Sequence, residues 1–216
     1  MFHQVHQGLR ALLYETALLI QRTDFSVAEE AAGTAGHIEQ VVSLFEKHAH
    51  TEDSFVFPML AGYEPSVVTT FEEEHVEDHV IGKTLEDGLK SVLTSENATE
   101  RILKGKELQR AFIRFMVFNL QHMAAEEDII NNLLWRYYSD EELQAVTGRI
   151  IAHVAPDAMQ QYSRWMVRGL NNTEILHWLQ GVKATAPAPV FEGLLAIMDQ
   201  ELPPARSRFI REMAGM

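Results

Sequence analysis

Histidine and carboxylate side chains at a spacing of four residues are the chemically conspicuous feature of this 216-residue chain. Residues four apart on an α-helix point in nearly the same direction, about 40° apart and roughly 6 Å along the axis. Both side chains of such a pair can therefore reach one point. Three pairs with this spacing are candidate ligands: His48 with Glu52, His75 with His79, and His122 with Glu126.

A metal ion is the ligand that these residue types favour. Neutral imidazole and carboxylate oxygen suit iron, manganese or zinc, and a carboxylate that uses both oxygens can bridge two cations. The chain has ten histidines and no cysteine, which excludes disulfides, thiolate metal sites and iron–sulfur clusters. A further histidine, His6, precedes the apolar positions of the first periodic segment. We therefore predict a metal centre built from nitrogen and oxygen ligands alone.

The charge balance narrows the classes of partner. The chain carries 18 basic and 31 acidic side chains, for a formal net charge of −13. This excess of negative charge argues against binding to nucleic acid or to an anionic membrane surface. The N-terminus has no basic segment followed by an apolar run, and charges interrupt every apolar stretch well before 18 residues. We expect a cytoplasmic protein.

Apolar residues recur at helical spacing along almost the whole chain, which predicts an all-α fold. Breaks rich in Pro, Gly, Ser and Asp delimit four long helices within residues 1–138, and short connections favour an antiparallel four-helix bundle. Ser26 and Ser139 are expected to cap helices, each with a glutamate three residues later. Five aromatic residues fall at core spacing: Phe55, Phe57, Phe115, Phe118 and Trp135.

Residues 139–216 differ from the preceding part, because their helices are shorter and punctuated by proline. Their apolar faces are too extensive for a linker. We expect a C-terminal helical extension that packs on the bundle or on a second subunit, which allows a homodimer through these helices.

The pattern of His, then His-x-x-x-Glu, then His, then His-x-x-x-Glu on successive helices resembles the hemerythrin family, in particular its bacterial HHE cation-binding members. The resemblance covers residues 1–138 and includes Phe57-Pro58 at the end of the second helix. It implies an up-down-up-down bundle around a non-haem di-iron centre. It also implies two bridging carboxylates with an oxo or hydroxo group, and reversible binding of dioxygen.

The resemblance further implies a role for each ligand. His6 and His48 would bind one iron, whereas His75, His79 and His122 would bind the other. Glu52 would bridge them together with Glu126, or with Glu127 if the five-residue spacing of the oxygen carriers applies. His3, one turn before His6, is an alternative ligand.

Three functions are compatible with such a centre. The first is binding of dioxygen or nitric oxide at an open iron position, for sensing, storage or protection. The second is a di-iron oxidoreductase that acts on peroxide, nitric oxide or ferrous iron. The third is a metal- or redox-sensing regulatory module with residues 139–216 as its output. No separate nucleophile and base stand out in the sequence, so the residues do not require the protein to be an enzyme. The same ligands would also suit zinc or manganese in place of iron.

Overall fold

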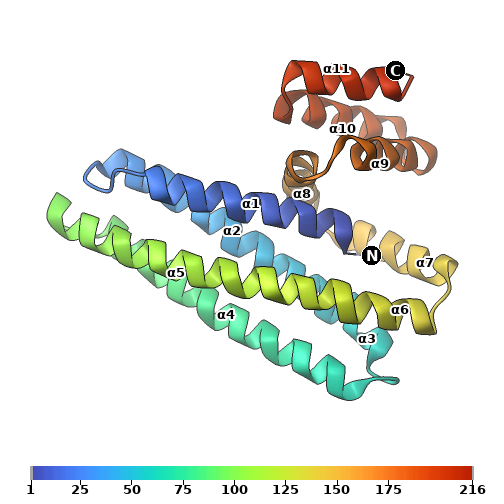
Figure 1. Cartoon of the computed structure of the whole chain (residues 1–216), viewed down its shortest axis with the longest axis horizontal. Coiled ribbons are helices and arrows are strands. Elements are labelled where there is room, and N and C mark those ends of the chain that lie inside the picture. The colour runs from blue at the N-terminus through green and yellow to red at the C-terminus, as the bar shows by residue number, and fades with distance from the viewer. Residues whose placement is uncertain (1, 216) are drawn as a thin grey trace. The chain divides into compact units, whose positions relative to one another are not determined.

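The computed structural model describes residues 2–215, and within that range it is helical with no strand (Figure 1). None of the described helices is long and apolar enough to cross a membrane. The elements in chain order are α1 (His3–Arg22), α2 (Ala28–Phe55), α3 (Phe57–Leu60), α4 (Pro65–Leu93), α5 (Ala98–Ala125), the π-helix η1 (Glu126–Ile130), α6 (Asn131–Tyr137), α7 (Asp140–His153), α8 (Pro156–Gly169), α9 (Asn172–Thr185), α10 (Ala188–Glu201) and α11 (Pro204–Met213).

Local sequence signals account for several helix boundaries. Proline begins α4, α8 and α11, where its missing N–H group would have no helical partner in any case. Ser139 caps α7 as predicted, because its hydroxyl accepts from the Glu142 N–H group at 3.3 Å and the Glu142 carboxylate accepts from the Ser139 N–H group at 2.9 Å. The predicted cap at Ser26 is wrong. Val27 precedes α2 without a side-chain cap, and the Ser26 N–H group donates to Asp24.

Two compact units divide the chain. Among the described residues, the first consists of residues 12–153, and the second of residues 2–11 and 154–215. The division therefore passes through α1 and after α7, whereas the sequence favoured a division between residues 138 and 139.

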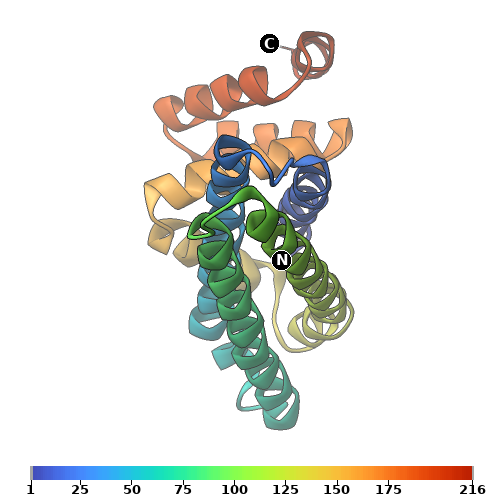
Figure 2. The same ribbon diagram turned by 90° about the vertical axis from the view of Figure 1, so that its left-hand side faces the viewer.

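The first unit is the helical bundle. Its long helices α2, α4 and α5 run alongside one another, and the second half of α1 is the fourth helix of the bundle. Both views show this arrangement (Figures 1 and 2). Large apolar side chains with almost no exposed surface fill its interior, among them Leu12, Leu13, Ile38, Leu44, Leu85, Leu108, Phe112 and Phe115. Burial of such side chains contributes about 1.5–3 kcal/mol each.

The predicted aromatic core is partly confirmed. Phe57 and Phe115 are 0% and 1% exposed. Trp135 is 60% exposed, so its assignment to the core is wrong. Ile130 and Leu134 face the core in this part of the chain. Trp135 directly follows Leu134, and adjacent residues on a helix point about 100° apart, so its side chain is turned toward solvent.

The second unit packs α8, α9, α10 and α11 around one apolar cluster. Its fully buried members include Val167, Ile175 and Met198. The N-terminal half of α1 belongs to this unit and crosses α8 at very close range. A β-carbon on Gly8 would lie 2.8 Å from the backbone nitrogen of Met166, and one on Gly169 would overlap the carbonyl oxygen of Gln7. Only glycine permits these backbones to approach so closely.

The substitution Gly169→Ala is therefore expected to lower the free energy of unfolding of the second unit by about 1–3 kcal/mol, since the new methyl group would meet rigid backbone. Urea unfolding followed by hydrogen exchange in α8 measures this change. Gly193→Ala is the matched control, because no described atom lies within 4 Å of a β-carbon there. The control should be neutral or stabilising by up to about 1 kcal/mol. Equal unfolding midpoints for the two variants would contradict the close helix crossing.

Candidate metal centre

Three helices of the bundle bring the histidine–carboxylate pairs to its interior. His48 and Glu52 lie in the last two turns of α2, His75 lies in α4, and His122 and Glu126 lie where α5 passes into η1. Their relative exposures are 9% or less, and Glu126 is fully buried. Buried charges of this kind are costly unless they are paired or bind a metal.

One group of four side chains lies entirely within the bundle unit. Glu52, His75, His122 and Glu126 each offer a ligand atom, and these atoms all lie within 4.8 Å of one another. The His75 Nε2 atom is 3.5 Å from Glu52 Oε2, and the His122 Nε2 atom is 3.4 Å from Glu126 Oε1. Two imidazoles and two carboxylates thus face one point.

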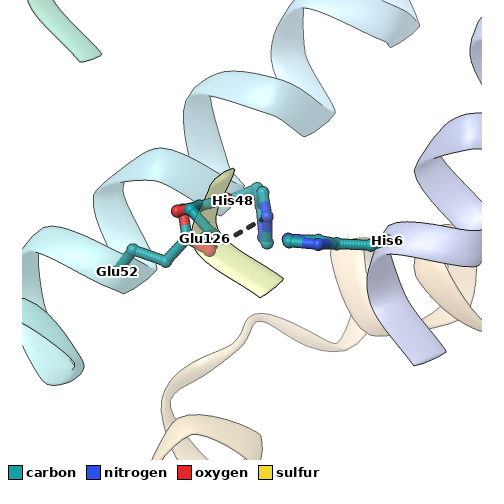
Figure 3. Close-up of side chains that lie close together, drawn as sticks. All are labelled: His6, His48, Glu52 and Glu126. Atoms are coloured by element: carbon teal, nitrogen blue, oxygen red, sulfur yellow. Dashed lines mark ion pairs between the residues drawn. The ribbon is translucent and has the colours of Figure 1, made fainter. Parts of the chain in front are cut away.

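A second group shares both carboxylates with the first. Within the bundle unit, His48, Glu52 and Glu126 also offer ligand atoms within 4.8 Å of one another, and Figure 3 shows their side chains close together. The His48 Nε2 atom is 3.1 Å from Glu52 Oε1, whereas the other oxygen of Glu52 faces His75. One carboxylate therefore presents one oxygen to each group, which is the arrangement needed to bridge two cations.

Two acidic side chains orient the imidazoles from outside the centre. The His75 Nδ1 atom is 2.8 Å from Asp53 Oδ1, and the His122 Nδ1 atom is 2.6 Å from Glu74 Oε2. An ionised carboxylate can only accept, so Nδ1 donates in both contacts and the Nε2 lone pair is left for the centre. This is the outer contact that histidine ligands of metals usually make.

Aromatic rings surround the same two histidines. Phe57 stacks on His75 at 5.2 Å between ring centroids, and Phe118 lies parallel to His122 at 6.1 Å. Phe71 also contacts His122, at 5.6 Å. The surroundings of the centre are therefore apolar on this side, which restricts the access of water.

Comparison with known proteins identifies this arrangement. The family model described as the hemerythrin HHE cation binding domain matches residues 1–134. The chain belongs to this family. The resemblance and the all-α, hemerythrin-like fold with further C-terminal helices, both predicted from the sequence, are confirmed.

Curated proteins similar to this hemerythrin-family chain carry the name F-box/LRR-repeat protein 5. The protein of Mus musculus is 22% identical over 210 residues, which cover 94% of this chain and 29% of the relative. The protein of Bos taurus is 22% identical over 152 residues, which cover 70% of this chain and 21% of the relative. This chain thus spans less than a third of the length of these relatives. No solved structure matches it.

The buried acids and histidines of the hemerythrin domain shift one another's pKa. Burial, and then the charge of Glu126, raise the pKa of Glu52 well above its usual value. Burial by itself would lower the pKa of His122, but its contacts with Glu126 and Glu74 raise it to about 9. Without a cation, the domain therefore holds protons at this centre, and a metal ion must displace them.

The donor atoms of the hemerythrin domain fit a metal ion. The Nε2 atoms of His75 and His122 are buried and face carboxylate oxygens at 3.5 and 3.4 Å, but neither contact has the geometry of a good hydrogen bond. A buried polar atom left in this condition costs about 1–3 kcal/mol. A cation bound between these nitrogens and the facing carboxylates removes that cost, and the donor set suits iron, manganese or zinc.

Three predicted or alternative ligands are placed elsewhere. His79 belongs to neither group, because its side chain is 69% exposed and pairs with Glu46 at 3.4 Å. Glu127 lies outside both groups, which contain Glu126 instead. His3 is bonded to Glu174 at 2.8 Å within the second compact unit. The structure thus brings five predicted ligands of the bundle unit together: His48, Glu52, His75, His122 and Glu126. His6 is also buried, and it belongs to the second compact unit.

Sequence reasoning missed the two orienting acids. Asp53 follows Glu52 directly, and a position one residue after a ligand is a weak signal for a supporting contact. Glu74 stands in the acidic run from Glu72, which reads as a solvated helix face. Its partner His122 is 48 positions away, so no local spacing links the two.

Proposed function

We propose that this hemerythrin domain binds two iron ions, bridged by Glu52 and Glu126, and takes up dioxygen or nitric oxide at an open position. Such uptake would serve sensing, storage or protection. The observation that carries the proposal is the sharing of both carboxylates by the two ligand groups. Two separate mononuclear sites would need no common ligands.

Some residues of the site would hold the metal ions, and others shape the surroundings of the centre. Ferrous iron, when bound, supplies a redox-active centre with affinity for small diatomic ligands. Asp53 and Glu74 hold the protons of the Nδ1 atoms, so that His75 and His122 present Nε2. Phe57, Phe71 and Phe118 surround these imidazoles with apolar rings, which restrict water and favour a small uncharged ligand over an anion.

The exposed position of His79 supports an open coordination position. In the group of Glu52, His75, His122 and Glu126, the chain offers two imidazoles where the resemblance implied three. An iron ion that accepts more than four donors would then retain a position for an external ligand. This reasoning favours ligand uptake on the side of His75 and His122.

The proposal is tested by loading the protein with ferrous iron without oxygen and then admitting oxygen in a stopped-flow spectrometer. We expect a new visible absorption band that disappears when oxygen is removed. Elemental analysis of the same sample should give two iron ions per chain. The zinc-loaded protein is the control and should stay colourless, because zinc has no redox chemistry.

Two results would contradict this function. If the loaded protein produced no oxygen- or nitric-oxide-dependent band, ligand uptake would be ruled out. If it consumed peroxide or nitric oxide over many turnovers, the oxidoreductase would replace it as the better description. The cytoplasmic location and a homodimer through the C-terminal helices stay predictions from the sequence.

A further inference from the structure

A groove between α2 and α4 opens beside the metal centre of the bundle unit. It has a volume of about 490 Å³. Its lining consists of Glu46, Ala49, His50, Asp53, Glu72, His75, Val76, Asp78 and His79. We call this feature the α2–α4 groove.

The α2–α4 groove is built for cations rather than anions. Its described lining combines four carboxylates with three imidazoles and contains no lysine or arginine. A hollow between α4 and α5 has a different lining, which includes Lys104, Arg110 and Arg114. Clefts lined by one sign of charge concentrate the opposite ion and increase its rate of association.

His75 connects the α2–α4 groove with the centre. This side chain lines the groove, yet it is only 8% exposed and belongs to a ligand group. Its Nε2 atom, which has no hydrogen-bond partner among the described residues, lies 3.5 Å from Glu52 Oε2. Its Nδ1 atom contacts Asp53, whose side chain is 44% exposed. One imidazole is thus the partition between solvent-facing acids and the buried carboxylates.

A hydrated cation needs such a path. The ligands of the centre are 0–9% exposed, so an incoming ion must exchange its water for protein donors before it reaches them. At the outer side of the groove, Glu46 and His79 form a pair at 3.4 Å with side chains 48% and 69% exposed. A carboxylate and an imidazole at this distance can bind one cation together, while exposure lets the ion keep part of its hydration.

We infer that the α2–α4 groove is the access route by which divalent metal ions reach the centre, with Glu46 and His79 as the first contact and Asp53 beside His75 as the last. This inference rests on the metal-binding part of the proposed function. It assigns His79 a role in capture rather than in final ligation. Capture affects how fast the centre fills, whereas ligation affects how much metal it holds.

The rate of cobalt(II) uptake tests the access route, because cobalt absorption reports binding to imidazole and carboxylate. Stopped-flow mixing of metal-free protein with excess Co²⁺ is compared for the unchanged chain, the double variant Glu46→Gln/His79→Ala, and Glu46→Lys. We expect uptake by both variants to be about tenfold slower or more. Their final stoichiometry and cobalt spectrum should equal those of the unchanged chain.

Glu73→Gln is the matched control, because it removes one negative charge from an exposed position of α4 outside the described groove lining. This control should load at the unchanged rate. Added salt should slow the unchanged chain more than the double variant, since salt screens the attraction of the groove.

Each outcome decides between distinct interpretations. Unchanged uptake rates in both groove variants would overturn the access route. A lower stoichiometry or an altered spectrum of the double variant would also overturn it and would make His79 a ligand. If the unchanged chain bound no metal, the proposed function itself would fail. If it loaded at the expected rates but gave no oxygen-dependent band, only ligand uptake would fail.

Discussion

The substitution Glu126→Gln is expected to abolish stable binding of both metal ions. Glu126 belongs to both ligand groups and is fully buried, so no other described side chain can take its place. Loss of a supporting residue next to a metal ligand usually costs 10- to 100-fold in affinity, and loss of a shared ligand should cost more than roughly 100-fold. Elemental analysis after incubation with excess metal and desalting measures the effect.

Glu127→Gln is the control for this substitution. It makes the same chemical change one residue later, at a position outside both groups, and should retain the full metal content. The metal-free Glu126→Gln protein should remain folded, because the substitution removes a buried charge that raises the pKa of Glu52. Full metal binding by Glu126→Gln, or its loss in Glu127→Gln, would disprove the assignment of Glu126 as the shared carboxylate.

The stability of the metal-free protein is expected to fall between pH 6.5 and 9. His122 has a pKa of about 9 in the folded chain and an ordinary value of 6.5, so the folded chain holds this proton more tightly. Its contribution is fully present below pH 6.5 and is lost as the pH rises through about 9, an effect of up to about 3 kcal/mol. The raised pKa of Glu52 acts in the same direction, from pH 4.5 upward.

Metal binding should show the opposite dependence. A metal ion at the His122 Nε2 atom must displace a proton, so its apparent affinity should rise by about tenfold per pH unit over this window for each proton released. Calorimetric melting temperatures with and without metal, at pH 6.5 and 9, should therefore diverge by several degrees.

Glu74→Gln provides a control for the titration, because the Glu74 carboxylate helps to raise the pKa of His122. This variant should show a weaker pH dependence of the metal-free melting temperature. A metal-free melting temperature that did not change between pH 6.5 and 9 would exclude a protonated His122 as a source of stability.

Local sequence signals predicted most of the helices and their boundaries. The helical period and the breaks at Pro65, around Asn97 and at Ser139 correspond to observed helix boundaries, because proline and capping side chains act within one turn of their own position. Ser26 is not the cap because α2 begins at Ala28, so that Val27 occupies the cap position. Trp135 is exposed because the preceding residue, Leu134, faces the core, and adjacent residues on a helix point about 100° apart.

The ligand pairs within one helix were predictable for the same reason. His48 with Glu52, and His122 with Glu126, share a face because a helix of 3.6 residues per turn places them there. His75 and His79 obey the same rule, yet only His75 reaches the centre. Two residues can share a helix face although only one of them reaches the bundle interior, because the packing of the neighbouring helices decides which part of that face is buried.

The sequence by itself thus determined the helices, the nitrogen and oxygen chemistry of the centre, and the two pairs that each lie on one helix. The tertiary structure decided that Glu126 rather than Glu127 is common to the two groups with Glu52, and it alone showed that Glu74 orients His122. It also decided that His79 lies in an acidic groove rather than among the ligands. These relations depend on the spacing and rotation of packed helices, which arise from side-chain packing across the whole bundle and not from the period of any single helix.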